Sequence, residues 1–406
     1  HALGKSAQFL TSTREMELMF PLYDKENQYI DYDVNNSLMD CIKKFHFHAI
    51  LMMPTFMDKV KWQKSDSRWL EQFNFLKGTS AKKIVFSQDD YWLSNSRDSF
   101  YLEFKIDLVL PVVKRDHWKD LLPKFSKSGK ILQGFTAYRT DFYLSLARKV
   151  KSWDKRKIDF AYRASSFPTF PNEYGKIKAD IGKKFLMSLN NNEKNYKTDI
   201  SVGSYGSRSF LSGDKWYDFL SDTRAVLGSP SGSSVNIKNH KIAEKVSHFL
   251  RTKNNFYDAL EVIPASCKNK DYTGISPRNF EAAFLETLQI LVYGEYGGVM
   301  KEYRDYLPLE KDCSNIDEVL EIFNDTDKCL EVIENCKNTF LHNKKIDGLT
   351  LIKSIISFIK NETTELVNVD DNSIGDLRKK IQYNYPITRT VDLFKKGVNK
   401  IVNKFS

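Results

Sequence analysis

The chain has 406 residues, of which 41% are hydrophobic, 13% aromatic and 28% charged. This length exceeds one ordinary hydrophobic core and predicts two domains of roughly 150–200 residues each, and the sequence has no run of about 18 apolar residues that would span a membrane. An excess of 62 Lys and Arg over 52 Asp and Glu gives a net charge of +10, which favours anionic partners such as nucleotide diphosphates, acidic lipid headgroups or nucleic acid, although an AT-rich genome explains the many Lys residues equally well.

Short apolar runs separated by helical stretches make up the first part of the chain. After a mostly helical start, buried strands are expected at residues 48–54, 83–87, 106–111 and 130–134. Strands that alternate with helices predict βαβ units on a parallel sheet. Residues 1–145 are therefore predicted to form an N-terminal Rossmann-like domain.

The same pattern starts again after a basic, helical connector at residues 146–156. Strands are expected at residues 157–162, 198–202, 224–228, 290–293 and 306–309. Helices are expected at residues 174–189, 215–220, 240–260, 277–289 and 316–323, and residues 229–238 have the composition of a loop. The sequence thus predicts an α/β fold of two Rossmann-like domains, residues 1–145 and 146–385, that face each other across a cleft.

The last segment, residues 386–406, is predicted to be a separate basic amphipathic helix. Its apolar residues recur at spacings of mostly three and four, with Lys residues between them. Such a helix can lie on an anionic membrane surface or pack back on a domain.

The five cysteines form no CxxC pair, which argues against a zinc site or a disulfide framework and favours a reducing cytoplasm. We therefore expect a cytoplasmic protein, with the inner face of the membrane as a further candidate location.

A glycine-containing loop that leads into a helix, residues 274–281, is the first candidate site. Ser276 suits the N-cap and Pro277 the first helical position. The free N–H groups of a helix start, together with Arg278, predict a phosphate site, and Glu281 one turn later is placed to accept hydrogen bonds from a ribose diol. A well-capped helix with Arg278 in a salt bridge is the alternative.

Three further segments at expected strand ends carry candidate donor-binding residues. The glycine-rich turn after residue 293 contributes Glu295, Gly297 and Gly298, because glycines allow a backbone to approach a ligand closely. The serine-rich loop after residue 228 contributes Ser231, Gly232 and Ser233. Arg163 ends another strand, where it can hold an anion or pair with Asp159. Simple turns or surface loops are the alternatives.

The sequence contains no P-loop lysine and no GxGxxG, which leaves ATPase and dehydrogenase functions without a motif.

Two carboxylates, an amide and two aromatic residues follow a strand of the first domain. Asp89 and Asp90 are candidate general bases for an acceptor hydroxyl, and Gln88, Tyr91 and Trp92 are candidate acceptor-binding residues because aromatic faces stack on sugar rings. A helix N-cap with solvated acids is the alternative. Too few oxygen ligands are present here to predict a divalent metal site.

Several of these segments carry a family resemblance, above all residues 275–321 with their Arg-x-x-Glu, Gly-Glu-Tyr-x-Gly and Tyr-x-Pro-Leu patterns. The chain resembles a family of bacterial glycosyltransferases of the GT-B class, and its C-terminal half is similar to the spore-maturation-type glycosyltransferase module. The resemblance implies an acceptor on the N-terminal domain, a nucleotide sugar on the C-terminal domain, and no bound metal. Glu281 matches the second glutamate of the Glu-x7-Glu pattern, and Thr273 stands where the first would be.

The sequence therefore predicts a transferase that moves a sugar from a nucleotide sugar to a hydroxyl of a lipopolysaccharide, capsule or lipid-linked glycan acceptor. The nucleotide sugar is a co-substrate, no other cofactor is expected, and the absence of an RNA- or DNA-binding motif predicts no nucleic-acid partner. The alternative is a binding or scaffold protein without turnover. It is favoured by Ser229 and Pro230, which stand where relatives often carry an acidic residue.

Overall fold

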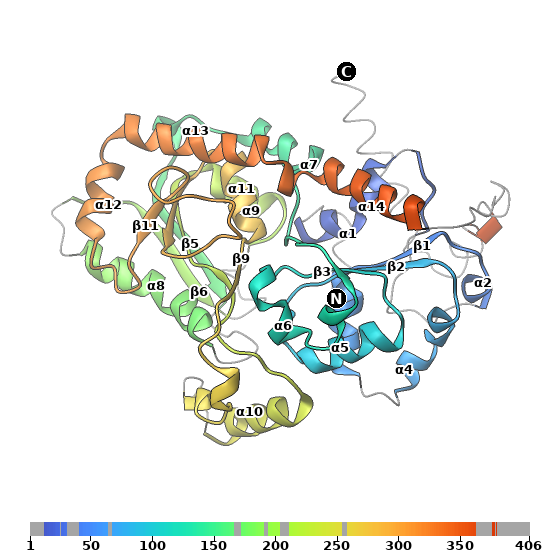
Figure 1. Ribbon diagram of the computed structural model, residues 1–406. Helices are drawn as coiled ribbons and strands as arrows, with labels where there is room; N and C mark the ends of the chain where they lie inside the picture. Colours follow the sequence, from blue (N-terminus) through green and yellow to red (C-terminus); the bar gives the residue numbers. More distant parts are fainter. Residues whose placement is uncertain are drawn as a thin grey trace.

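The structure is a computed structural model with two lobes (Figure 1). It describes residues 12–24, 26–30, 40–63, 67–165, 172–190, 194–203, 211–253 and 258–362, and also 376, 377 and 379. The predicted amphipathic helix at residues 386–406 lies outside the described residues, so its membrane role stays a prediction.

The first lobe holds a sheet in which every pairing is parallel, with strand order β1-β2-β3-β4. The strands are β1 (Ala49–Met52), β2 (Lys82–Phe86), β3 (Leu108–Leu110) and β4 (Lys130–Ile131). Each lies within one residue of a stretch for which the sequence predicts a strand. Short apolar runs are informative here because the inner strands of a parallel sheet are covered on both faces.

Helices cover both faces of this sheet, as the alternation of side chains requires. Ile84 and Phe86 pack in one hydrophobic cluster with residues of α1 and α14. Val85 and Val109 pack in a second cluster with residues of α3 and α5. The helices of the lobe are α1 (Ser12–Tyr23), α2 (Asp40–Lys43), α3 (Pro54–Trp62), α4 (Arg68–Glu71), α5 (Ser94–Glu103) and α6 (Trp118–Leu121), joined by α14 (Gly348–Glu362) from the end of the chain. The next helix along the chain, α7 (Asp141–Ser145), packs on the second lobe.

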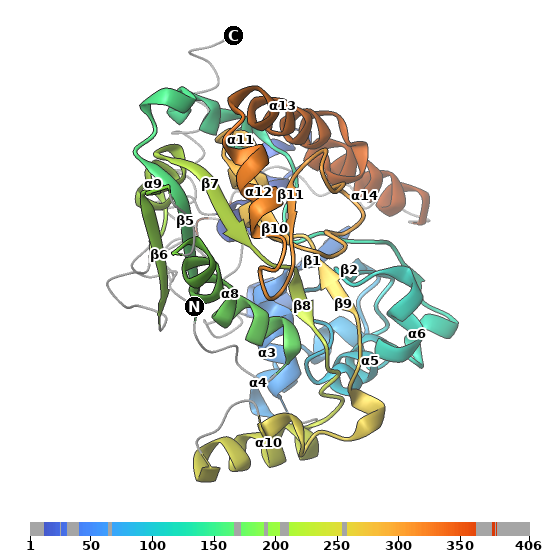
Figure 2. The ribbon, with the colours of Figure 1, turned by 90° about the vertical axis from the view of Figure 1, so that its left-hand side faces the viewer.

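The second lobe holds a parallel sheet with strand order β11-β10-β7-β5-β6 (Figure 2). The strands are β5 (Ile158–Ser165), β6 (Thr198–Gly203), β7 (Thr223–Gly228), β10 (Leu288–Val292) and β11 (Leu307–Leu309). Numbered within the lobe, this order is 2-1-3-4-5. It is a doubly wound, Rossmann-like arrangement whose direction of growth reverses between β5 and β7.

Two layers of helices enclose this second sheet. Phe160 and Ile290 face the hydrophobic cluster that contains α8 and α12, whereas Val226 and Leu291 face the cluster that contains α9 and α11. The helices are α8 (Glu173–Leu189), α9 (Asp214–Ser221), α11 (Pro277–Phe284), α12 (Ile316–Phe323) and α13 (Thr326–His342). Together the two lobes confirm the predicted α/β class.

Three sequence predictions of local structure after residue 228 are wrong. The expected loop at 229–238 contains β8 (Ser231–Ser233), which pairs antiparallel with β9 (Tyr272–Gly274), a strand that was not predicted. The helix expected to reach residue 289 ends at Phe284, and Glu286 has a positive φ of 52° that the helix cannot continue through. The helix expected at 240–260 is α10 (His240–Lys253), followed by a short 3₁₀ turn at Asp258–Leu260.

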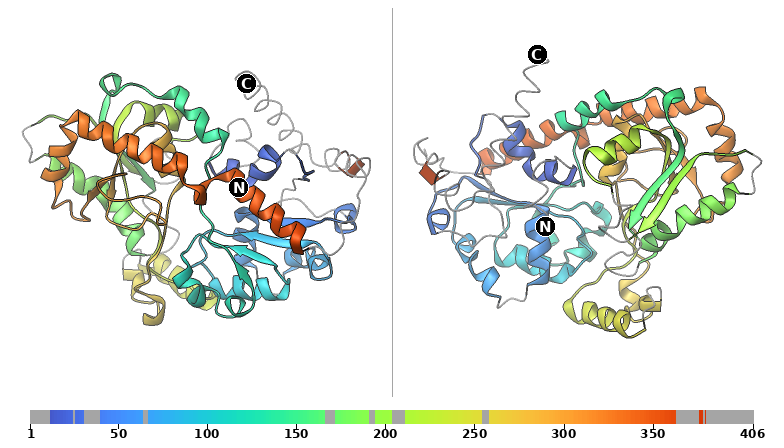
Figure 3. Two further views of the ribbon diagram at one scale, coloured as in Figure 1. Left: turned by 45° about the horizontal axis from the view of Figure 1, so that its top comes forward. Right: turned by 180° about the vertical axis from the view of Figure 1, so that it is seen from behind.

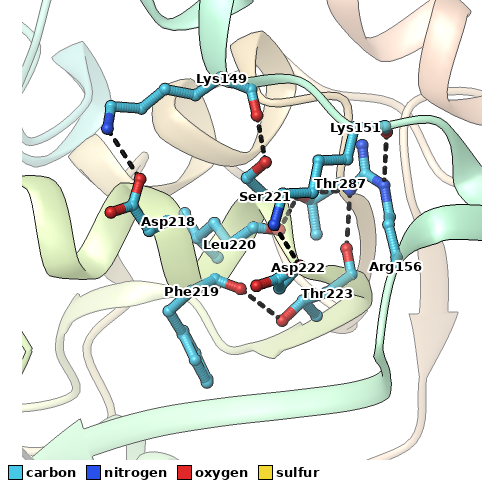
Figure 4. Close-up of polar contacts among 10 residues, drawn as sticks. All are labelled: Lys149, Lys151, Arg156, Asp218, Phe219, Leu220, Ser221, Asp222, Thr223 and Thr287. Atoms are coloured by element: carbon cyan, nitrogen blue, oxygen red, sulfur yellow. Dashed lines mark hydrogen bonds and ion pairs between the residues drawn. The ribbon is translucent and has the colours of Figure 1, made fainter.

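The connector between the lobes consists of two 3₁₀ turns, Leu146–Lys149 and Trp153–Lys155, rather than the expected helix. Polar contacts fasten it to α9 and the start of β7 (Figure 4). Buried Arg156 donates to the carbonyl oxygens of Thr223 at 2.7 Å and Leu285 at 3.0 Å, and Lys149 pairs with Asp218 at 2.7 Å. These hydrogen bonds and this ion pair, rather than the hydrogen bonds of a helix, hold the connector in place.

Two segments that follow residue 146 in the sequence pack on the first lobe. Domains with boundaries at residues 145 and 385 would assign both segments to the second lobe. One is α14, which lies on the same face of the first sheet as α1 (Figures 1 and 3). The other is the cross-lobe segment, residues 231–253 and 258–275. In it, Ile237 forms a parallel bridge with Trp92, and the Tyr272 ring stacks on Tyr91 at a centroid distance of 6.1 Å.

The junction of the lobes is filled largely by these apolar contacts. Both hydrophobic clusters of the first lobe include side chains from the second, among them Phe280, Tyr296 and Ile237. No helix within the described part of the chain is both long and apolar enough to cross a membrane.

Candidate functional site

A cavity lies beside the reversal of strand order between β5 and β7, at the carboxyl ends of the strands. Parallel α/β sheets bind ligands at this place, because the chain leaves neighbouring strands in opposite directions and opens a crevice. The cavity encloses about 570 Å³ of empty space that includes open solvent. Its polar lining residues are Tyr162, Arg163, Lys178, Trp216, Ser229, Ser231, Ser276, Arg278, Asn279 and Gln289.

The charged residues among the described lining of this cavity are all cations. Arg163, Lys178 and Arg278 contribute three cationic groups, and none of the described residues that line the cavity is Asp or Glu. Gathering cations without acids is unfavourable unless an anion is bound, because like charges at short range repel. The described lining of the cavity is therefore positively charged, with the Asp199 and Asp89 carboxylates beside two of its cations.

Lys178 lies on α8, where its carbonyl oxygen accepts a hydrogen bond from Tyr162 at 2.7 Å. The pKa of Lys178 is lowered to about 8, first by burial and then by the positive charge of Arg278, against an opposing effect of the Asp89 carboxylate. A bound anion would reverse the effect of Arg278. The Lys178 amine is therefore influenced both by a cation of the cavity and by a carboxylate of the first lobe.

The start of α11 combines both interpretations made from the sequence. Ser276 is the N-cap and accepts from the N–H of Arg278 at 3.3 Å, while Asn279 accepts from the N–H of Ser276 at 3.0 Å. The capping part of the alternative is therefore confirmed, but the expected salt bridge of Arg278 is not. Arg278 is nevertheless exposed and lines the cavity, where it donates to the carbonyl oxygen of Arg163 at 2.6 Å. It is in no salt bridge among the described residues, so its charge is available to a ligand.

Arg163 reaches the cavity from the end of β5 and is ion-paired as well. Its partner is Asp199 at 2.7 Å, not Asp159, which pairs instead with Arg224 at 2.7 Å. The Arg163 guanidinium lies over the ring of Phe219, 4.4 Å from its centroid. Its Nε is buried and has no hydrogen-bond partner among the described residues. One donor of Arg163 is therefore buried and unpaired beside the cavity residues.

The serine-rich segment after β7 is divided between the cavity and the sheet edge. Ser231 lines the cavity together with Ser229. Gly232 and Ser233 do not line it, because they form β8 with β9. Gly232 has a φ of 124° and the Tyr272 carbonyl beside its Cα, so no other residue fits, and buried Ser233 is bonded within its own turn. For these two residues the structure shows a role in the β8–β9 strand pair in place of the expected ligand contact.

Glu281 does not line the cavity, contrary to expectation. Its carboxylate is buried and accepts a hydrogen bond from the Trp216 indole at 2.7 Å. Trp216 lines the cavity, whereas Glu281 does not. The structure thus places Glu281 outside the cavity lining, where direct contact with a ribose was expected.

No residue of the turn after β10 is among those that line the cavity, although Gly294 packs against Pro230, which does line it. Glu295 is exposed and forms an ion pair with Lys114 of the first lobe. Gly297 and Gly298 have φ values of 63° and 66°, which explains the two glycines as a left-handed turn. Their expected role in donor binding is replaced by a turn at the lobe junction.

The segment at residues 88–92 lies where the two lobes meet. Asp89 is exposed, has a left-handed φ of 52°, and accepts from the Tyr91 hydroxyl at 2.6 Å. It is close enough to Lys178 to raise the pKa of that amine. Asp90 is fully buried, accepts from Ser87 and lies 3.9 Å from buried Arg97. Asp90 therefore cannot serve as a base for an acceptor, whereas Asp89 stays a candidate.

The expected acceptor-binding residues are mostly packed inside the junction. Tyr91 and Trp92 are each 7% exposed, and both belong to the hydrophobic cluster shared with the cross-lobe segment. Their rings are used in packing, which contradicts stacking on a sugar. Gln88 is half-buried, and its amide lies 3.5 Å from the carbonyl oxygen of Thr136.

Lys178, Trp216, Asn279 and Gln289 are cavity residues that sequence reasoning missed. Asn279 and Gln289 bond to each other, with 2.8 Å between the Asn279 amide nitrogen and the Gln289 amide oxygen. Lys178 follows the first strand of the second lobe on a helix with several other lysines, and no local signal distinguishes it from them. Only the folded arrangement brings these residues together.

Within the described residues, no group of three or more His, Cys, Asp or Glu is placed to hold a metal ion. The five cysteines are all unpaired thiols, and four of them are buried.

Comparison with known proteins gives fold similarities only. No family model matches the chain, and no curated protein matches it. The chain is similar to a solved glycosyltransferase from Rickettsia africae ESF-5 at 10% identity, with a TM-score of 0.44 over 75% of this chain and 76% of that one. It is similar to TarM at 11% identity and a TM-score of 0.44, over 71% of this chain and 53% of that one. A third similarity is to an alpha-glucosyltransferase in complex with UDP and a 13-mer DNA, at 10% identity and a TM-score of 0.44, over 73% and 78%. Likenesses this weak decide neither the family nor the activity.

Proposed function

We propose that this protein is a glycosyltransferase that uses a nucleotide sugar, and that the nucleotide diphosphate binds in the cavity beside β5 and β7. The single observation that carries the proposal is the set of Arg163, Lys178 and Arg278 around a cavity whose described lining contains no acid. The proposal also rests on the place of the cavity, at the reversal point of a parallel sheet.

The cationic cavity suits the leaving group of sugar transfer. The acceptor oxygen forms a bond to the anomeric carbon, the bond from that carbon to the phosphate oxygen breaks, and the nucleoside diphosphate leaves with the electron pair. Lys178 and Arg278 would stabilise the negative charge that develops on the diphosphate. The acceptor hydroxyl must lose its proton, and Asp89, across the junction from Lys178, is the candidate that receives it.

The acceptor is proposed to be a hydroxyl of a surface glycan or lipid-linked glycan that enters from the side of the first lobe. This follows from the resemblance of the sequence and from the position of Asp89. Independence from a metal ion is likewise proposed, and unchanged turnover in the presence of a chelator would support it.

Binding is tested by thermal unfolding in the presence of UDP, GDP, CMP and dTDP and their sugars. A ligand at 100 times its Kd stabilises the folded state by about 2.7 kcal/mol, so one nucleotide class is expected to raise the unfolding temperature. Arg278→Ala is expected to abolish that increase. Arg68→Ala is the matched control, because Arg68 is an exposed arginine on α4 of the other lobe. Equal stabilisation of the Arg278→Ala variant would remove Arg278 from the site.

A binding protein without turnover is the second candidate function. It is favoured by the absence of any acid among the described lining residues and by the burial of Asp90 and Glu281. A protein of this kind would be stabilised by a nucleotide sugar yet release no free nucleotide from it, with or without glycan acceptors. Release of nucleoside diphosphate above the uncatalysed rate would rule this candidate out.

A further inference from the structure

Two arginines at the cavity lie on two aromatic rings of the same helix. Trp216 and Phe219 are three residues apart on α9 and therefore share one face of it. Their ring centroids are 5.7 Å apart with planes inclined by 31°. The Arg278 guanidinium lies 5.4 Å from the Trp216 ring centroid, and the Arg163 guanidinium lies 4.4 Å from that of Phe219.

We infer that Trp216 and Phe219 form an aromatic platform that positions Arg278 and Arg163 for an anionic ligand, and that Glu281 holds the platform in place. This inference rests on the proposed function, since it concerns the same cavity. Trp216, Phe219 and Glu281 are positioning residues in it. The groups that would touch the ligand are the two guanidinium groups.

The platform addresses a physical difficulty of the site. An arginine side chain has about 2 kcal/mol of rotamer entropy, which a ligand must overcome if the side chain is mobile before binding. An aromatic ring beneath the guanidinium restrains it through a cation–π interaction without neutralising its charge. Arg278 keeps its full charge and gains a further restraint from the carbonyl oxygen of Arg163.

Hydrogen bonds fix the platform at the Trp216 ring and at the last turn of α9. The buried Glu281 carboxylate accepts from the Trp216 indole N–H at 2.7 Å, which sets the orientation of the ring. At the end of α9, the Phe219 carbonyl oxygen accepts from Thr223 at 2.8 Å, and the Ser221 hydroxyl donates to the carbonyl of Lys149 (Figure 4). The acid that sequence reasoning assigned to a ribose thus acts through Trp216.

The first measurement needs no ligand. Ring currents of Trp216 shift the NMR signal of the Arg278 side-chain Nε–H, which is assigned by its loss in Arg278→Lys. Trp216→Leu is expected to move this signal to the position of an exposed arginine. Glu281→Leu is expected to move it in the same direction, and Glu281→Gln is expected to leave it in place, because the amide oxygen still accepts from the indole. An unmoved Arg278 signal in folded Trp216→Leu would overturn the inference.

The second measurement is the affinity for inorganic pyrophosphate, and for UDP, by calorimetry. Trp216→Leu and Glu281→Leu are each expected to bind about tenfold more weakly than the wild type, whereas Glu281→Gln retains affinity to within about threefold. Trp216→Phe keeps a ring but lacks the N–H that Glu281 accepts, so its affinity is expected to lie between those of Trp216→Leu and the wild type. Leu330→Ala, at an exposed site on α13, is the control for general effects of truncation. Unchanged affinity of a folded Glu281→Leu variant would overturn the role of Glu281.

Failure of the platform and failure of the proposed function give different results. If the wild type binds neither a nucleotide nor pyrophosphate, the proposed function is wrong, while the NMR measurement still decides whether Trp216 positions Arg278. If Glu281→Leu does not fold, Trp216→Phe and Trp216→Leu decide the question instead. Equal affinities of the two variants would overturn the need for a ring, and wild-type affinity of Trp216→Phe would overturn the role of Glu281.

Discussion

Asp89 and Asp90 are neighbours in the chain, yet one carboxylate is exposed near Lys178 and the other is buried beside Arg97. The left-handed backbone of Asp89, with a φ of 52°, separates the two side chains. Burial raises the pKa of Asp90, and Arg97 and the Ser87 hydroxyl oppose that shift. The pair therefore combines a candidate base and a structural acid.

Substitution of Asp89 is expected to affect turnover, whereas substitution of Asp90 is expected to affect the stability of the fold. Asp89→Asn should lower turnover by about 10²- to 10⁴-fold with little change in nucleotide affinity, because it removes a proton acceptor and keeps the shape. Asp90→Ala should lower the free energy of unfolding by about 3–5 kcal/mol, because Arg97 is left buried without its partner. Steady-state kinetics and denaturant unfolding measure the two effects. Full turnover by Asp89→Asn would show that the base lies elsewhere.

The affinity for a nucleotide is expected to fall as the pH rises above about 8. The pKa of Lys178 is lowered to about 8, so the amine is charged below that pH and loses its charge above it. An anionic ligand prefers the charged form and raises this pKa on binding, so binding takes up protons at higher pH. Calorimetry across pH 7–9.5 in buffers of different ionisation enthalpy measures both quantities. Lys178→Met is the control and should show weaker binding without that proton uptake; an identical pH profile would refute the role of Lys178.

Two glycines with positive φ are expected to differ strongly in their tolerance of alanine. A Cβ on Gly232 would overlap the Tyr272 carbonyl oxygen, and its φ of 124° suits glycine alone, so Gly232→Ala should cost about 3 kcal/mol or more of stability. Gly298 has a φ of 66° and no atom within 4 Å of such a Cβ, so Gly298→Ala should cost about 1–2 kcal/mol. Thermal unfolding of the two variants compares these costs, and equal losses would contradict the hairpin geometry.

The two lobes are expected to unfold in one transition. Both hydrophobic clusters of the first lobe contain side chains of the second, and Ile237 of the cross-lobe segment is fully buried in one of them. Ile237→Ala should destabilise the protein by about 2–5 kcal/mol and lower the unfolding temperature of both lobes by the same amount. Calorimetry with probes in each lobe tests this. Two separate transitions in the wild type would show that the lobes are independent.

Local patterns were enough to predict most of the fold. The strands at 49–52, 82–86 and 223–228 are short apolar runs whose environment on both faces of a parallel sheet demands such residues. The N-cap at Ser276 followed from the chemistry of one turn. The same local chemistry gave no reason to expect β9, because its pairing partner lies about 40 residues earlier.

Of the candidate site, residue type and strand-end position were sufficient to select Arg163, Ser231, Ser276 and Arg278, all of which line the cavity. They were not sufficient to show which acids are exposed. Asp90 and Glu281 are polar residues near the right strands, but burial against Arg97 and Trp216 depends on contacts made across the fold. Lys178 acquires its importance in the same way, since its charge matters only because α8 and α11 bring it near Arg278. Periodicity along a chain encodes which elements form and which side faces the core; the neighbours of a charged group are set by packing between elements distant in sequence, which periodicity does not encode.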